Sequence, residues 1–85
     1  MNYEIRFKRS ASEELLNLPD TIARRVLKVI GSLSENPRPM GCAKLKGTKS
    51  EYRLRLGNYR IIYTILDKEV LIIVIRIAHR KQVYR

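Results

Sequence analysis

A chain of 85 residues in which 45% are hydrophobic is long enough for one small folded domain, residues 1–85, and too apolar for a disordered protein. Its 18 Lys and Arg residues outnumber 8 Asp and Glu residues, and the formal net charge of +10 predicts a polyanion or an acidic protein as partner. One Cys and one His exclude a disulfide framework and argue against a metal site, so we expect neither metal nor cofactor. The chain lacks the roughly 18 consecutive apolar residues of a membrane span and a signal peptide at its start. We therefore expect a cytoplasmic protein without a membrane partner.

The first half of the chain predicts a strand and two helices. Apolar and polar residues alternate over residues 2–8, as in a half-buried strand. Ser10 and Glu13 match a capping box, so a first helix should begin at about Ser10 and end before Pro19. An apolar stripe at helical spacing predicts a second helix from Pro19 to Asn36. Because almost nothing separates the helices, we expect an antiparallel helix hairpin.

Residues 52–63, YRLRLGNYRIIY, predict two strands joined by a tight turn at Gly57-Asn58. In this register Arg55 lies opposite Arg60, and Arg53 points to the same face. The other face carries apolar and aromatic residues, namely Tyr52, Leu54, Leu56, Tyr59, Ile61, Tyr63 and Ile65. Like charges directly opposite each other destabilise a sheet by about 0.2–1 kcal/mol. The arginines therefore form either a solvated basic surface or a site where several guanidinium groups bind one phosphate.

Two further segments complete a small sheet. Residues 42–48 predict a short strand followed by a turn. The lysines there, Lys44, Lys46 and Lys49, are either solvated or help to position phosphate. The apolar run at residues 70–78 predicts a central or doubly covered strand.

The loop before residues 70–78 decides which of their side chains face the helices. With residues 67–69 as a three-residue loop, Arg60 pairs with Arg76, and Arg76 joins the other arginines. A two-residue loop would put Arg76 on the core face, which an unpaired charge resists. The preferred register puts Leu71, Ile73, Ile75 and Ile77 under the helices. It leaves Ile62, Leu66, Ile72 and Val74 on the arginine face, where we expect a partner peptide to cover part of them.

The C-terminal residues 79–85, HRKQVYR, leave the last strand at the end of the sheet that carries Arg55 and Arg60. Such a tail is normally a solvated surface, but the apolar residue before Tyr84 indicates that it packs back. Arginine stays protonated and is a poor general base, so His79 and Tyr84 are the candidates for proton transfer near the arginines. Tyr84 could instead stack on an RNA base.

The stretch YRLRLGNYRIIY, together with HRKQVY at residues 79–84, resembles the RelE family of bacterial and archaeal toxins in the RelE/ParE superfamily, over essentially the whole chain. The resemblance implies an α+β fold, with an N-terminal strand and an antiparallel helix hairpin packed on one face of a small, mainly antiparallel β-sheet. It implies a toxin that inhibits translation as a ribosome-dependent endoribonuclease, cleaving mRNA in the A site by metal-free attack of the 2′-hydroxyl group. The implied partners are the ribosome, mRNA and an acidic, RelB-like antitoxin. Toxin and antitoxin would form a hetero-oligomer, and operator DNA would bind only through that complex.

The resemblance also implies roles for residues. Arg60 matches the family arginine that stabilises the transition state, while Arg80 and Tyr84 match the basic residue and the tyrosine of the tail. Arg53 and Arg55 match two basic positions that are lysines in the best-known member. The candidate catalytic residues are Arg53, Arg55, Arg60, His79, Arg80 and Tyr84, and the candidate RNA-binding residues are Lys44, Lys46, Lys49, Arg76, Lys81 and Arg85.

Three alternatives stay open at this stage. If a lysine is the general base in some relatives, either His79 fills that role here or the site works mainly by electrostatics. A toxin of the ParE type would share the fold but inhibit DNA gyrase by binding. An inactive relative would act only in an antitoxin and operator complex. An RNase needs Arg60, Arg80 and Tyr84 together, whereas a gyrase inhibitor should tolerate their loss.

Overall fold

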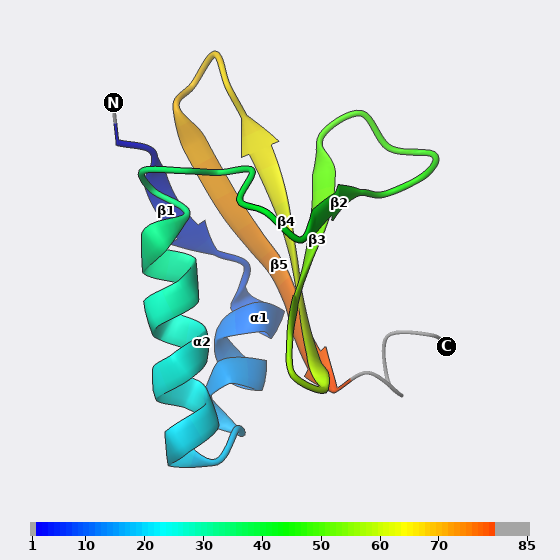
Figure 1. Ribbon diagram of the computed structural model, residues 1–85. Helices are drawn as coiled ribbons and strands as arrows, with labels where there is room; N and C mark the ends of the chain where they lie inside the picture. The colour runs from blue at the N-terminus through cyan, green and yellow to red at the C-terminus, as the bar shows by residue number, and fades with distance from the viewer. Residues whose placement is uncertain (1, 80–85) are drawn as a thin grey trace.

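The computed structural model describes residues 2–79, in which two helices cover one face of a five-stranded sheet (Figure 1). Along the chain the elements are β1 (Glu4–Phe7), α1 (Arg9–Leu16), α2 (Asp20–Ser32), β2 (Cys42–Lys44), β3 (Glu51–Leu56), β4 (Tyr59–Leu66) and β5 (Leu71–His79). The strand order β1-β5-β4-β3-β2 puts β4 at the centre. β1 runs parallel to β5, and the other neighbouring strands are antiparallel. The expected α+β class, with a helix hairpin on one face of a mainly antiparallel sheet, is confirmed.

Helix α1 begins before Ser10, so the capping box predicted for Ser10 and Glu13 is wrong. Its N-cap is Lys8, which makes no side-chain capping hydrogen bond. The Lys8 N–H donates to the Val74 carbonyl at 2.9 Å, and the Lys8 carbonyl accepts the Ser12 N–H at 3.0 Å. The chain thus passes from sheet pairing directly into the helix, and this tertiary contact sets the boundary in place of the local capping signal.

Helix α2 begins at Asp20, one residue after the predicted start, and Pro19 is its N-cap with a φ of −55°. The helix ends at Ser32, earlier than the predicted Asn36. Just beyond its end, the Ser34 carbonyl accepts the Tyr3 N–H at 2.8 Å, and the Ser34 hydroxyl donates to the Tyr3 carbonyl at 2.7 Å. Pairing with the N-terminal segment therefore competes with further helical turns.

The core lies between the helices and the sheet. Its buried residues come from the helical layer (Ala11, Val26, Ile30 and Leu33) and from the strands (Leu54, Ile61, Tyr63, Ile65, Ile72, Val74 and Ile77). Each fully buried aliphatic side chain contributes about 1.5–3 kcal/mol. Because the core uses one face of the sheet, the other face can carry charged side chains. Neither helix of the described residues is long and apolar enough to cross a membrane.

The hairpin of β3 and β4 has the predicted register. Leu56 pairs with Tyr59, and Arg55 lies opposite Arg60. Gly57 takes a positive φ of 60°, whereas Asn58 does not, which matches a two-residue turn with glycine at its first central position. The alternation of apolar and charged residues on these two strands was therefore a reliable guide to the face of each side chain.

The register predicted for β4 and β5 is wrong. The connecting loop has four residues rather than three, because Leu66 pairs with Leu71, and its last residue, Val70, has a positive φ of 52°. A bulge at Ile75 then shifts the register. Arg60 lies opposite Ala78, not opposite Arg76.

With strict alternation along β5, Ile72 and Val74 could be buried only if Arg76 were buried as well, and the bulge removes this conflict. It lets β5 bury Ile72, Val74 and Ile77 against the helices while Arg76 stays on the opposite face, across from Ile62. The predicted position of Ile77 is correct, and those of four other residues are reversed. Ile72 and Val74 lie in the core, whereas Leu71 and Ile73 lie on the arginine face.

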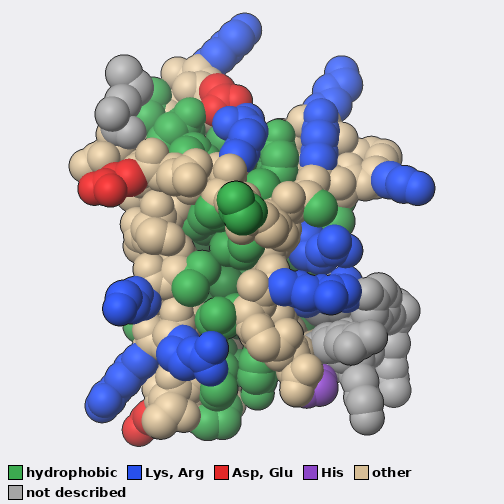
Figure 2. Space-filling model, viewed as in Figure 1, with side chains coloured by type: hydrophobic (Ala, Val, Ile, Leu, Met, Phe, Trp, Pro, Cys, Tyr) green, Lys and Arg blue, Asp and Glu red, His purple; other side chains and the backbone are tan. Residues whose placement is uncertain are grey.

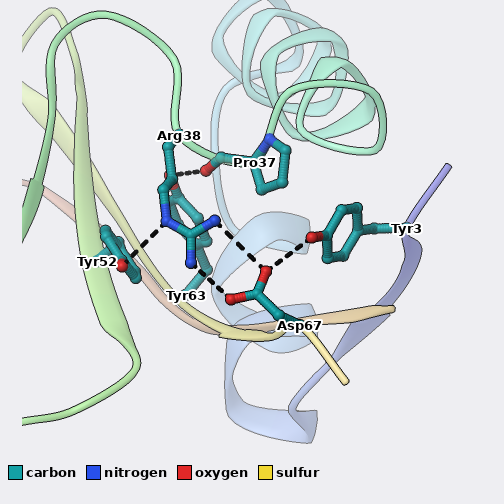
Figure 3. Close-up of polar contacts among 6 residues, drawn as sticks. All are labelled: Tyr3, Pro37, Arg38, Tyr52, Tyr63 and Asp67. Atoms are coloured by element: carbon teal, nitrogen blue, oxygen red, sulfur yellow. Dashed lines mark hydrogen bonds and ion pairs between the residues drawn. The ribbon is translucent and has the colours of Figure 1, made fainter. Parts of the chain in front are cut away.

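A polar network joins four segments at the end of the sheet away from the Gly57-Asn58 turn (Figure 3). Arg38 Nη2 donates to Asp67 Oδ2 at 2.8 Å, and Arg38 Nε donates to the Tyr52 hydroxyl at 3.1 Å. The Tyr3 hydroxyl donates to Asp67 Oδ1 at 2.7 Å. These hydrogen bonds, first that from Arg38 and then that from Tyr3, lower the pKa of Asp67. Sequence reasoning missed this network because its members are far apart in the chain.

Candidate functional site

Arg53, Arg55, Arg60 and Arg76 lie on the sheet face opposite the helices, which we call the arginine face. Arg55 and Arg60 lie side by side on β3 and β4, and Arg53, Ile62 and Arg76 form the next row across β3, β4 and β5. Neighbouring strands are about 4.8 Å apart, and residues two apart on one strand are separated by about 6.7 Å. Guanidinium side chains are long compared with this spacing, and the phosphate site expected at Arg53, Arg55 and Arg60 stays a prediction.

The four side chains differ in exposure. Arg55 and Arg76 are exposed and Arg53 is half-buried, whereas Arg60, on the central strand, is only 2% exposed. A buried guanidinium group has already lost most of its rotamer freedom, so less entropy is lost when it binds an anion. Arg60 is therefore the most preorganised member of the arginine face.

His79 is the last residue of β5, and it pairs with Tyr59. Its ring meets the Tyr59 ring edge to face, with centroids 5.3 Å apart and an interplanar angle of 83°. Because Ala78 shares the face of Arg60, the next residue, His79, starts from the opposite side of the sheet. The structure thus brings His79 to the Arg60 end of the sheet but places it on the Tyr59 side.

The predicted lysines lie away from this end of the sheet. Lys44 ends the edge strand β2, and Lys46 and Lys49 lie in the loop before β3, all of them exposed. Figure 1 shows this loop at the opposite end of β3 from the Gly57-Asn58 turn. The lysines could therefore contact a nucleic acid only at a distance from Arg60. The remaining candidates Arg80, Lys81, Tyr84 and Arg85, and the predicted packing of the tail, lie outside the described residues.

Sequence reasoning missed Glu14 of α1. Its Oε1 atom accepts the backbone N–H of Ile77 at 2.8 Å, and its Oε2 atom lies 3.5 Å from Arg76 Nε. The Glu14 side chain is 31% exposed. The sequence signal was slight, because Glu14 looks like one more polar residue on an amphipathic helix. Figure 2 shows many Lys and Arg side chains with few Asp and Glu side chains between them.

The family model described as "ParE toxin of type II toxin-antitoxin system, parDE" matches residues 5–84. The chain belongs to the RelE/ParE toxin family. A curated relative, "Toxin RelG" of Mycobacterium tuberculosis, is 31% identical over 86 residues, which cover 100% of this chain and 99% of the relative. The "mRNA interferase toxin RelE" of Escherichia coli is 29% identical over 84 residues, covering 96% of this chain and 87% of the relative.

A solved structure of the archaeal RelE–RelB complex from Pyrococcus horikoshii has a TM-score of 0.84 and 32% identity, covering 94% of this chain and 97% of that chain. This similarity extends over both the helical layer and the sheet. The predicted membership in the RelE family, and the fold that it implied, are therefore confirmed. The protein is a RelE-family toxin of a toxin–antitoxin system.

Proposed function

We propose that this toxin is an endoribonuclease that cleaves mRNA in the ribosomal A site and so inhibits translation. The observation that carries the proposal is the arginine face, where Arg53, Arg55 and Arg76 surround the buried Arg60. The 29% sequence identity of the chain to a relative named mRNA interferase supports the same activity. The net charge of +10 favours encounter with RNA, the main component of the ribosome.

In the proposed reaction the 2′-oxygen attacks the adjacent phosphorus and the bond to the 5′-oxygen breaks. The products are a 2′,3′-cyclic phosphate and a free 5′-hydroxyl group, so one proton leaves the 2′-oxygen and one is delivered to the 5′-oxygen. Negative charge accumulates on the phosphorane oxygens, and Arg60 is placed to stabilise it together with Arg53 and Arg55. This chemistry needs positioning and charge stabilisation, and both suit a rigid sheet.

Proton transfer is assigned to residues near the C-terminal end of β5. Arginine is protonated at all ordinary pH values and cannot act as the base. His79 and Tyr84 are the candidate proton carriers, with Arg80 as a further positive charge. Because His79 starts from the Tyr59 side of the sheet, it can act only on RNA that passes around the end of β4 and β5. Lys44, Lys46, Lys49, Lys81 and Arg85 would contact more distant phosphates.

The proposed partner protein is an acidic, RelB-like antitoxin. The similar structure from Pyrococcus horikoshii is a RelE–RelB complex. On the arginine face, half-buried apolar residues begin at Ile62, in the row of Arg53 and Arg76, and continue away from the arginines through Ile73 to Leu66 and Leu71. A peptide that combines apolar and acidic side chains would cover both kinds of surface. In this proposal toxin and antitoxin form a hetero-oligomer that binds operator DNA through the antitoxin.

The test is primer extension on an mRNA translated in a purified system, with wild type and Arg60→Ala side by side. We expect cleavage within A-site codons by the wild type and none detectable in the same time with Arg60→Ala, whose cleavage should be about 10²- to 10³-fold slower. Arg24→Ala is the matched control, because Arg24 is an exposed arginine of α2 and lies away from the arginine face. Cleavage by Arg60→Ala at the wild-type rate would refute the site.

Inhibition of DNA gyrase is the second candidate function, because the matching family model carries the name of the ParE toxin. A gyrase inhibitor would act by binding and would tolerate Arg60→Ala. Intact mRNA with the wild-type protein, together with loss of DNA supercoiling by gyrase, would favour this function.

A further inference from the structure

A cavity of about 520 Å³ lies between α1, the turn that follows it and the C-terminal half of β5. Its lining includes Glu14, Asn17, Tyr59, Arg76 and His79. The cavity exists because β1 pairs with β5 only as far as Val74. Beyond this residue, the edge of β5 that faces α1 pairs with no other strand of the described residues.

Glu14 partly replaces the missing strand. Its Oε1 atom accepts the Ile77 N–H at 2.8 Å, which fixes the orientation of the carboxylate at the cavity wall. Its Oε2 atom lies 3.5 Å from Arg76 Nε. An ionised carboxylate has about four lone-pair sites, so these two contacts leave it able to accept further hydrogen bonds.

We infer that this cavity is a guanine-binding subsite and that Glu14 accepts hydrogen bonds from the N1–H and N2–H groups of the base. Guanine presents two adjacent donors on its Watson–Crick edge, and these match a carboxylate. Adenine and cytosine each place an acceptor beside their amino group, and uracil flanks its single N–H with two carbonyl groups, so a carboxylate repels part of each of these edges. The role in RNA cleavage rests on the proposed function.

The other wall residues suit a nucleotide. Tyr59 and His79 border the cavity with aromatic rings, the kind of side chain that contacts unstacked RNA bases. Arg76 belongs both to the cavity and to the arginine face. Arg76 therefore connects the cavity to the arginine face, where phosphates of the same RNA strand would bind.

The first test is a nucleotide titration of isotope-labelled protein made by cell-free synthesis, followed by NMR. The probes are the 5′-monophosphates of guanosine, inosine and adenosine, which share the phosphate and differ in the donors of the base. The expected result is a shift of the Ile77 amide, with guanosine monophosphate binding roughly 5- to 150-fold more tightly than adenosine monophosphate, the range of a good bidentate pair. Inosine monophosphate, which lacks the 2-amino group, should fall between them.

The decisive variant is Glu14→Gln, because glutamine keeps an acceptor for the Ile77 N–H and loses the paired acceptors. The preference for guanosine monophosphate should disappear in Glu14→Gln and persist in Glu13→Gln. Glu13 is the matched control, since its side chain is 64% exposed and its ion pair with Arg9 is on the surface. Equal affinity for the three nucleotides, no shift at Ile77, or a preference that survives in Glu14→Gln would each overturn the inference.

Cleavage provides the second test and separates this inference from the proposed function. In the translation assay, the wild type should cut fastest at codons with guanine at one fixed position, and Glu14→Gln should lose that preference while still cutting codons without guanine. An active wild type with no dependence on guanine would overturn the subsite and leave the proposed function standing. An inactive wild type would refute the proposed function, and the nucleotide titration would then decide the subsite alone.

Discussion

Replacing Arg60 by lysine separates the geometry of its guanidinium group from its charge. Arg60 is 2% exposed on the central strand, with Arg55 on one side and Ala78 on the other. A lysine keeps the positive charge but loses the planar fork that can donate two parallel hydrogen bonds to phosphate oxygens. One hydrogen bond to a charged group contributes about 1.5–3 kcal/mol. Arg60→Lys should therefore lower the single-turnover cleavage rate by roughly 10- to 150-fold, since about 1.4 kcal/mol corresponds to a factor of ten.

The assay is single-turnover cleavage of ribosome-bound mRNA, with thermal unfolding measured in parallel. Arg60→Ala should lose about 10²- to 10³-fold, the usual effect of removing a transition-state donor. Arg24→Lys, on the surface of α2, should leave the rate unchanged. If the unfolding midpoint of Arg60→Lys falls by less than about 8 °C, the variant has lost no more than about 1–2 kcal/mol of unfolding free energy. Full activity of Arg60→Lys would refute the reasoning from fork geometry. A loss explained by unfolding of the variant would refute the catalytic assignment.

The remaining predictions concern phosphate binding, burial and the bulge. Arg55→Ala should reduce the slope of log affinity against log salt for a non-cleavable RNA by about 0.7, as measured by fluorescence anisotropy, and an unchanged slope would mean that Arg55 contacts no phosphate. Burial raises the pKa of Tyr63, so its contribution to stability is complete below its unfolded pKa of about 10 and is lost as pH rises above that value. Tyr63→Phe removes the 2.8 Å hydrogen bond to the Pro37 carbonyl and should lower the free energy of unfolding by about 1–3 kcal/mol at pH 7. In urea unfolding, the variant should also lose less stability than the wild type as pH rises above about 10. An equally steep loss in both proteins would contradict the burial argument. Deleting Ile75 should remove the bulge and either expose two core aliphatic residues or bury Arg76. The free energy of unfolding measured in urea should then fall by about 3–6 kcal/mol. An unaltered midpoint would show that the bulge has no such role.

The two hairpins show what the sequence could specify. β3 alternates strictly between charged and apolar residues, and Tyr59, Ile61, Tyr63 and Ile65 continue its apolar face along β4. A shift by one residue would expose this apolar set, so only one register is acceptable. The run at residues 71–75, LIIVI, has no such alternation, and either face of β5 could enter the core. The choice came from the parallel pairing of Ile5 with Ile72, a contact between the two ends of the chain. Local pattern alone could not reveal it.

The site was predictable to a similar extent. The shared face of Arg53, Arg55 and Arg60 could be predicted, because the sequence specifies the register of the β3–β4 hairpin. Glu14 does not, because its role depends on where β1 stops along β5 and on which backbone N–H is left at that edge. The burial of Arg60 was equally hidden, since a residue on the face opposite the helices is expected to be exposed. The role of Glu14 arises from contacts between elements that are far apart in the sequence.

The proposed activity and the proposed neutralisation use the same side chains. The hairpin holds Arg55 opposite Arg60, an arrangement that costs a sheet about 0.2–1 kcal/mol. Any anion that binds between them gains attraction and also relieves this repulsion, whether it is an RNA phosphate or a carboxylate of an acidic antitoxin. The two ligands therefore compete, and salt weakens both. What separates them is the apolar part of the arginine face, including Ile62 and Ile73, which a peptide can cover with its own apolar side chains and a phosphodiester backbone cannot. In this proposal, the antitoxin binds more tightly than RNA because of these apolar residues rather than because of the arginines.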